Sequence, residues 1–416
     1  MDSRTRLVTA LAHREGPVPI DLGATATTGL HVSVVAALRE HYGLQPEPVK
    51  VIEPYQMLGE VDEGLKAAIG VDVEGVWPRE TMFGFPNEHW RPWRTPWGQE
   101  VLVSRHFRTT REGEDTLIYP RGDTSAPASG RMPGGGWFFD TIIRQPPLDE
   151  ATLNVEDNLE EFGPLDEAAL AAFRRDVDAA SRTGRGVIAN FGGTGLGDIA
   201  LVPAPMLARP RGIRDVEEWY VSTVARKDYV REIFDRQTGI AVANLARIGD
   251  ALDDGVDVLF VCGTDFGTQT STFCSRETFD SLWAPSYGLI NGWVHAHTGW
   301  RTFKHCCGAA EPLIESFIAS GFDVLNPVQV SARGMDPATL KARYGGRLVF
   351  WGGGVDTQKT LPFGTPAQVR DEVLRRCEVF ARGGGFVFDA IHNVQAKTPI
   401  ANVIAMIDAV HEFNGD

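Results

Sequence analysis

The sequence predicts an α/β fold and, within that class, a (β/α)8 TIM barrel. Short apolar runs alternate with longer segments of helical periodicity, which is the pattern of βα units around a parallel sheet. Eight such runs occur in the chain, and eight units favour a closed barrel over a doubly wound sheet. The predicted strands cover residues 17–21, 72–77, 186–191, 256–261, 301–305, 323–326, 347–351 and 385–389.

Helical patterns follow most of these strands, after a cluster of Gly, Asn, Asp or Pro that ends the apolar run. Apolar residues recur there with the period of a helix that has one buried face. The clearest segments are residues 28–42, 59–69, 365–382 and 402–413.

The regular order of elements is interrupted between about residues 77 and 140. Proline, tryptophan and alternating polar and apolar residues in this stretch predict a small antiparallel β meander, inserted after a barrel strand. Within it, residues 125–136 (SAPASGRMPGGG) are expected to form a flexible loop or lid. We therefore expect one TIM-barrel domain over residues 1–416, with an insertion at about 77–140.

Composition and charge exclude several classes of protein. The 416 residues are 43% hydrophobic and 23% charged, as in ordinary globular proteins. Forty Lys and Arg against fifty-five Asp and Glu leave a net charge of −15, which argues against nucleic acid as a partner. No segment approaches the roughly 18 apolar residues of a membrane span, so we expect no membrane association.

The compartment is inferred from the cysteines and from the first residues. Five cysteines, two of them adjacent at Cys306 and Cys307, do not form the regular spacing of a disulfide framework. The first fifteen residues mix charged and apolar side chains, unlike a signal peptide. A cytoplasmic protein is the expectation.

Polar side chains stand directly after most of the predicted strands. In a TIM barrel the active site lies at the C-terminal ends of the strands, so these residues predict a small-molecule site. The alternative for any one of them is that the side chain caps the following helix. The residues in question are Asp21, Asp265, Gln269, Gln329, Asp356, Gln358, Asp389, His392 and Gln395.

The sequence His305-Cys306-Cys307 ends the fifth predicted strand. Side chains alternate along a strand, so His305 and Cys307 share one side and Cys306 takes the other. Imidazole with thiolate suits zinc, and His392, just after the last strand, is the best-placed third donor. The alternative is that Cys307 is an ordinary buried thiol.

The sequence excludes two phosphate-binding motifs. The run GGTGLGD from Gly192 is similar to a dinucleotide-binding loop, but its third glycine falls one place early. No P-loop sequence is present, which excludes that class of NTPase.

The order of motifs resembles the uroporphyrinogen decarboxylase superfamily. The matching segments include RTRLVTALAHREGPVPIDLG, GTDFGTQ, FKHCCGA, GFDVLNPVQ, GGGVDTQ, LPFGTP and GGGFVFDAIHNVQ. They extend over nearly the whole chain outside the insertion. The superfamily contains porphyrinogen decarboxylases and zinc methyltransferases that move a methyl group between a corrinoid protein and a thiol or other acceptor. The resemblance implies a TIM barrel, as the strand count also does.

Two features place the resemblance closer to the methyltransferases. The decarboxylases hold substrate carboxylates with arginines after the first strand, where this chain reads DLGATATTGLH without any. The methyltransferases carry H-x-C, matched by His305 and Cys307, and a later Cys at whose position His392 stands. The resemblance therefore implies zinc held by His305, Cys307 and His392, and a corrinoid carried by a separate protein, because the chain has no D-x-H-x-x-G motif.

The sequence thus predicts a zinc-dependent methyltransferase acting on a small methyl acceptor or donor. Asp265 and Asp389 are expected to orient the ligands or take the acceptor's proton. The residues expected to bind substrate are Gln269, Gln329, Asp356, Gln358 and Gln395.

Two alternatives stay open. One is a metal-free decarboxylase or lyase acting on a small carboxylated substrate, with His392 and Asp389 in acid-base roles and Cys307 structural. The other is a non-enzymatic corrinoid-binding or scaffold protein. The polar ring at the strand ends argues against the second, because buried polar groups are costly without a role.

Overall fold

The parallel sheet of the predicted barrel is present in a computed structural model, which describes residues 1–252 and 254–416. Its strand order is β15-β14-β13-β12-β11-β10-β3, and every pair of neighbours is parallel. The strands are β3 (Val73–Val76), β10 (Gly186–Ala189), β11 (Val258–Cys262), β12 (Arg301–His305), β13 (Val324–Asn326), β14 (Val349–Trp351) and β15 (Phe386–Val387).

The segment from Pro19 to Asp21 closes this sheet into a barrel. On one side Ile20 bridges Phe388 in parallel, with the Asp21 amide donating to the Phe388 carbonyl at 2.9 Å. On the other side the Asp72 amide donates to the Ile20 carbonyl at 2.8 Å, just before β3. The predicted TIM-barrel fold is therefore confirmed, with the first of its eight strands shortened to this seam.

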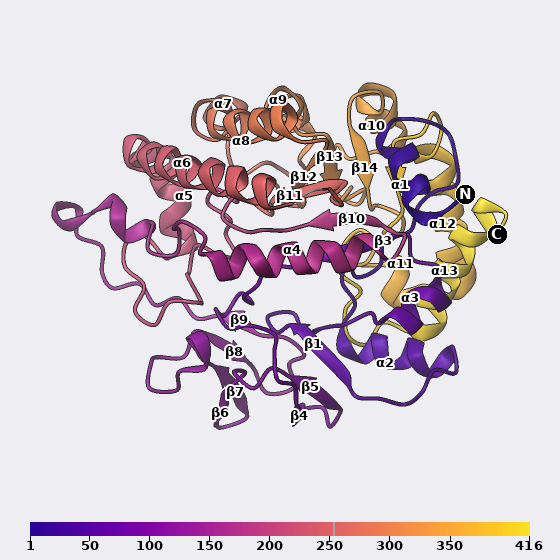
Figure 1. The fold of residues 1–416 in the computed structure, drawn as a ribbon, viewed down its shortest axis with the longest axis horizontal. Helices are drawn as coiled ribbons and strands as arrows, with labels where there is room; N and C mark the ends of the chain where they lie inside the picture. The colour runs from indigo at the N-terminus through magenta and orange to yellow at the C-terminus, as the bar shows by residue number, and fades with distance from the viewer. Residues whose placement is uncertain (253) are drawn as a thin grey trace.

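Helices surround the parallel strands (Figure 1). The segments predicted at 28–42, 59–69, 365–382 and 402–413 correspond to α2, α3, α12 and α13. The helices are α1 (Ser3–Leu11), α2 (Val32–His41), α3 (Glu63–Ile69), α4 (Glu167–Ser181), α5 (Val216–Ala225), α6 (Lys227–Ala251), α7 (Arg276–Leu282), α8 (Ala284–His297), α9 (Ile314–Ala319), α10 (Pro337–Tyr344), α11 (Thr360–Phe363), α12 (Pro366–Phe380) and α13 (Ile400–Asn414). None of those formed by the described residues is long and apolar enough to cross a membrane.

Helix α1 fills the N-terminal end of the barrel. Its Leu7 belongs to the cluster of inward-facing strand residues, and a Cβ on Gly186 would lie only 2.2 Å from Leu7. The Arg4 amide donates to the Gly184 carbonyl, just before β10. Because α1 fills this end, we expect ligands to enter from the opposite, C-terminal end of the strands.

Two small sheets lie beside the barrel, below it in Figure 1, and the insertion supplies their strands except β1 and β2, which precede it. The sheet β6-β7-β8-β9 is the predicted antiparallel meander. The other, β2-β1-β5-β4, contains a parallel pair, β1 with β5, that was not predicted. The strands are β1 (Val49–Glu53), β2 (Leu58–Gly59), β4 (Arg91–Arg94), β5 (Glu100–Val103), β6 (Thr109–Glu112), β7 (Asp115–Ile118), β8 (Gly130–Met132) and β9 (Asp140–Thr141).

The expectation of a flexible loop at residues 125–136 is wrong for its central part. Strand β8 lies there, paired with both β7 and β9, and the Ser129 and Met132 side chains are fully buried. The proline and glycine content of the segment is explained by turns on either side of this strand, where Gly135 has a φ of 75°.

Candidate metal and active site

Three polar side chains continue the inward-facing rows of the barrel strands. Phe303, Val324 and Val387 belong to the apolar interior, and His305, Asn326 and Asp389 lie two residues further along β12, β13 and just beyond β15. Because alternate residues of a strand point to the same side, these three face the barrel axis at its C-terminal end.

The three predicted metal ligands lie together at this end. One donor atom from each of His305, Cys307 and His392 falls within 4.8 Å of the other two. The Cys307 Sγ lies 3.4 Å from His305 Nε2, and the two imidazole rings have centroids 5.3 Å apart. Cys306 is directed elsewhere, and its Sγ accepts the Phe266 amide at 3.3 Å.

The donor set fits a divalent metal ion. Burial lowers the pKa of both His305 and His392 to about 4, so both rings are neutral at pH 7 and have a lone pair to offer. Burial raises the pKa of the Cys307 thiol well above its usual range. A thiolate at this position therefore needs a compensating positive charge, which a bound metal ion would supply.

Neighbouring groups fix the orientation of His305 and Cys307. His305 Nδ1 lies 2.7 Å from Asn326 Oδ1, so this nitrogen carries the proton and Nε2 faces Cys307 with a free lone pair. Asp265 Oδ1 accepts the Cys307 amide at 2.6 Å and lies 3.8 Å from His305 Nε2. Asp265 thus lies where a residue that orients the ligands is expected.

His392 differs from His305 in its hydrogen bonding. Its Nδ1 accepts the Asn393 amide at 2.8 Å, so a neutral ring carries its proton on Nε2. Binding of a metal through Nε2 would require that proton to leave Nε2 and the contact with Asn393 to be lost.

Asp389 is a buried carboxyl whose Oδ2 has no hydrogen-bond partner among the described residues. Burial and the nearby Asp21 raise its pKa well above the usual range. Asp21 accepts hydrogen bonds from Trp351 Nε1 at 2.9 Å and from the Ala24 amide at 3.1 Å, and burial raises its pKa to about 6. Asp21, which ends the first predicted strand, was not among the residues given a role.

The residues predicted to bind substrate divide into two groups. Gln329 is buried, and its Oε1 accepts the Gly308 amide at 2.6 Å, while Asp356 accepts the amides of Gln358 and Lys359. Both bond to nearby backbone amides, but Asp356 does not cap the following helix, because the N-cap residue of α11 is Lys359 and it has no side-chain cap hydrogen bond. Gln269, Gln358 and Gln395 lie outside the buried centre, with Gln269 Nε2 3.3 Å from Gln358 Oε1 on exposed side chains.

The glycine-rich run that begins at Gly192 supplies a further carboxyl group at the strand ends. Asp198, the last residue of GGTGLGD, accepts the Ala200 amide, and burial raises its pKa to about 6. A Cβ on Gly263, just after β11, would lie 2.8 Å from Asp198 Oδ2. The sequence signal for this residue is an aspartate that directly follows the glycine-rich run after a strand.

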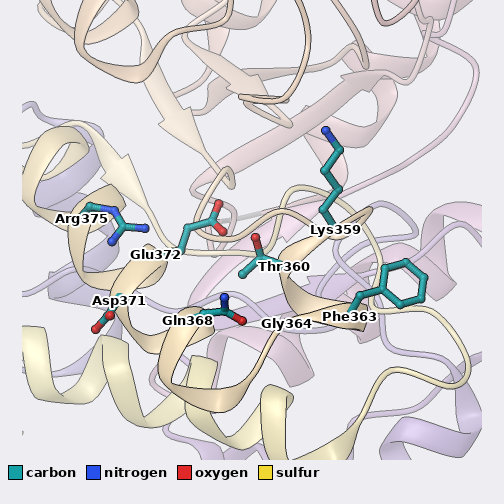
Figure 2. Close-up of a pocket in the computed structure, with 8 residues that line it drawn as sticks. All are labelled: Lys359, Thr360, Phe363, Gly364, Gln368, Asp371, Glu372 and Arg375. Carbon is teal, nitrogen blue, oxygen red and sulfur yellow. The ribbon is translucent and has the colours of Figure 1, made fainter.

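A separate groove lies between α11 and α12 and contains none of the three candidate ligands. Its volume is about 430 Å³, and its Phe363 is 84% exposed. Figure 2 shows Phe363 and Lys359 pointing away from α12. The lining residues are Lys359, Thr360, Phe363, Gly364, Gln368, Asp371, Glu372 and Arg375.

Sequence comparison finds one family and short stretches of similarity to its members. The model of the family described as uroporphyrinogen decarboxylase (URO-D) matches residues 203–413, half of the chain. The chain is 34% identical over 80 residues to a uroporphyrinogen decarboxylase of Psychromonas ingrahamii and 30% identical over 77 residues to one of Actinobacillus succinogenes. These stretches span 19% and 18% of this chain, and 22% and 21% of the two relatives.

Structural comparison extends the similarity to the full chain. A methyltransferase from Methanosarcina mazei superposes with a TM-score of 0.55 over 99% of both chains, at 13% sequence identity. At that identity the superposition establishes a shared fold, which includes the part of the chain that the family model does not reach.

Proposed function

The chain belongs to the uroporphyrinogen decarboxylase family, and from this premise we propose that it is a zinc-dependent methyltransferase. It would move a methyl group between a corrinoid protein and a thiol or other small acceptor. The observation that carries the proposal is the convergence of His305, Cys307 and His392 at the C-terminal end of the barrel. Two imidazoles and a thiolate are donors that zinc prefers, and three protein ligands are typical of a catalytic zinc site.

Zinc bound by these residues would lower the pKa of an acceptor thiol or hydroxyl, so that the nucleophile forms at neutral pH. Asn326 holds His305 in the tautomer that leaves Nε2 free, and Asp265 fixes the backbone of Cys307. Asp389, protonated in its buried position, is placed to hold or release a proton at its unpartnered Oδ2.

The residues of the loop after the first strand favour a substrate that carries few carboxylates. Thr25 and Thr28 lie in this loop, and their hydroxyl groups are hydrogen-bonded to each other at 3.1 Å. The decarboxylases that the chain resembles have arginines at this place. The buried carboxyl of Asp21 lies nearby, and its negative charge at neutral pH would repel an anionic substrate. The Methanosarcina mazei protein is an example of a methyltransferase with this fold.

The hydrogen bonding of His392 favours a second candidate, a metal-free decarboxylase or lyase. With its proton on Nε2 and Asp389 protonated nearby in the chain, His392 could act as an acid or base without binding a metal. Cys307 would then be structural.

Elemental analysis of the full-length protein, purified without a metal-binding tag, separates the two candidates. About one zinc per chain, together with transfer of the methyl group from a methylated corrinoid protein to a thiol, would support the methyltransferase. Protein that contains no zinc, and that gains no activity when zinc is added, would contradict it in favour of the lyase.

A further inference from the structure

Lys304 is a fully buried lysine directly behind the candidate metal site. It precedes His305 on β12 and points to the opposite side of the strand, toward the surrounding helices. Its Nζ donates hydrogen bonds to the carbonyl oxygens of Thr264 at 2.7 Å and His305 at 3.0 Å.

Three aromatic rings surround the same ammonium group. Nζ lies 4.8 Å from the centroid of Phe266, 5.4 Å from that of Phe317 and 5.8 Å from that of Tyr287. No carboxylate oxygen of the described residues lies within 4.0 Å of Nζ. The positive charge is therefore balanced by two carbonyl dipoles and by ring faces, and not by an ion pair.

Such a placement has a cost that an apolar side chain would avoid. An ammonium group removed from water without an ionised partner loses hydration energy, which hydrogen bonds to carbonyls restore only in part. A methionine of similar length would fill the same aromatic surroundings without this loss. The lysine therefore has a role that core packing does not explain.

The two carbonyl groups that accept hydrogen bonds from Lys304 indicate its role, because each belongs to a strand end that carries a residue of the candidate site. Thr264 precedes Asp265, and His305 lies two residues before Cys307. The ladder between β11 and β12 ends at the pair formed by Cys262 and Lys304, so strand pairing does not hold Thr264 and Asp265 in place. The hydrogen bond from Lys304 to the Thr264 carbonyl joins this end of β11 to β12, while the Thr264 hydroxyl bonds to Leu196 and Tyr287.

We propose that Lys304 is a positioning residue of the metal site, whose ammonium joins the ends of β11 and β12 so that Asp265 and Cys307 stand ready for a divalent ion. This inference rests on the proposed metal-dependent function. Lys304 itself touches neither the ion nor the substrate, and it acts through the backbone it holds.

Binding of zinc to the full-length, metal-stripped protein tests the proposal, with affinity measured by competition against a chromophoric chelator. Lys304→Met removes both the hydrogen bonds and the charge, and we expect zinc affinity to fall about tenfold or more, as for other groups that orient metal ligands. Lys304→Gln keeps one donor and should fall less. The matched control is Lys341→Met, because Lys341 of α10 is also partly buried and donates to a backbone carbonyl, that of Gly384, away from the site. This control should bind zinc within about twofold of wild type.

Cobalt(II) gives a second readout that a loss of general stability would not produce. Bound to wild type, it should give a thiolate-to-cobalt absorption band, which in a folded Lys304→Met protein should be weaker or shifted as Cys307 moves. Equal affinities and equal spectra for wild type and Lys304→Met would overturn the proposal while leaving the zinc site intact. A wild type that binds no zinc refutes the proposed function itself. If both Lys304 variants fail to fold by circular dichroism, Lys304 belongs to the general core and the proposal is wrong.

Discussion

The C-terminal end of the barrel and the groove between α11 and α12 differ in how far their polar side chains are exposed to solvent. The groove has a volume of about 430 Å³ and is lined by charged side chains, of which Lys359, Asp371 and Arg375 are exposed (Figure 2). At the barrel end, His305 and Asp389 are only 3% and 1% exposed. Exposed charges keep their hydration, whereas buried ones must be neutralised, paired or bound to a ligand. We therefore expect the chemistry at the buried polar groups of the barrel end and not in the larger open volume of the groove.

The largest expected effect is on zinc binding and compares two adjacent cysteines. Cys307→Ala removes a direct thiolate ligand, so zinc affinity should fall by at least about 100-fold, beyond what the loss of an orienting group causes. Cys306→Ala should retain normal zinc content, because Cys306 is directed away toward the Phe266 amide. Metal analysis after dialysis measures both. Equal zinc in the two variants would contradict the assignment of Cys307.

The next effect concerns His392, whose present hydrogen bond competes with a ligand role. His392→Ala should lower zinc affinity about tenfold or more if the imidazole binds the metal. Competition with a chelator measures this directly, and a turnover assay is run in parallel. A variant that keeps full zinc occupancy yet loses turnover would show that His392 is an acid-base or substrate-binding residue.

A smaller effect is expected on the pH dependence of stability, through Asp21. Its pKa is about 6 in the folded protein and about 3.9 when unfolded, so the folded state holds more protons between these values. The free energy of unfolding therefore falls as pH rises through this window, by about 3 kcal/mol from this group. Asp21→Asn should remove most of that decline, and it should also lower the pKa of Asp389, which Asp21 raises.

Urea unfolding at pH 4.5 and pH 7.5 measures the change. The control is Asp371→Asn in the exposed groove, which should leave the pH dependence of wild type unaltered. An Asp21→Asn protein with the same dependence as wild type would show that Asp21 is not a proton-holding group.

The smallest effect is expected in the groove itself. Phe363→Ser replaces a side chain that is 84% exposed, so the free energy of unfolding should change by no more than about 0.5 kcal/mol. Zinc content should equal that of wild type. A loss of zinc or of methyl transfer would place the groove within the functional site and remove the contrast between the two regions.

The barrel was predictable because its strands are buried on both sides. Runs such as Val258–Cys262 are apolar throughout and stand out from their surroundings. Strands β4 (Arg91–Arg94) and β6 (Thr109–Glu112) are partly or fully exposed and rich in charge, so their sequences do not differ from those of loops. The pairing of β4 and β6 depends on neighbouring strands in their sheets, and a local sequence pattern does not predict it.

The candidate site was predictable in part for a similar reason. Alternation along one strand suffices to place His305 and Cys307 on a common side, and the position after the last strand suffices to suggest His392. The pairing of Asp21 with Asp389 depends on closure of the barrel between its first and last strands. The role of Gln329 and Asp356 depends on which backbone amides lie nearby. Neither is encoded within a short stretch of sequence.

Closure of the barrel by the short segment at Ile20 has a consequence for the order of assembly during synthesis. The Ile20 segment emerges early from the ribosome, but its partner Phe388 is translated close to the last helix. Until then the edges of β3 and β15 lack their common neighbour, and contacts between residues so distant in sequence form slowly. His305 and Cys307 lie two residues apart at the end of β12, whereas Asp389 becomes enclosed beside Asp21 only when the seam forms. We therefore expect the candidate metal-binding pair to come together before the acid pair, and the site to be completed when the two ends of the sheet join.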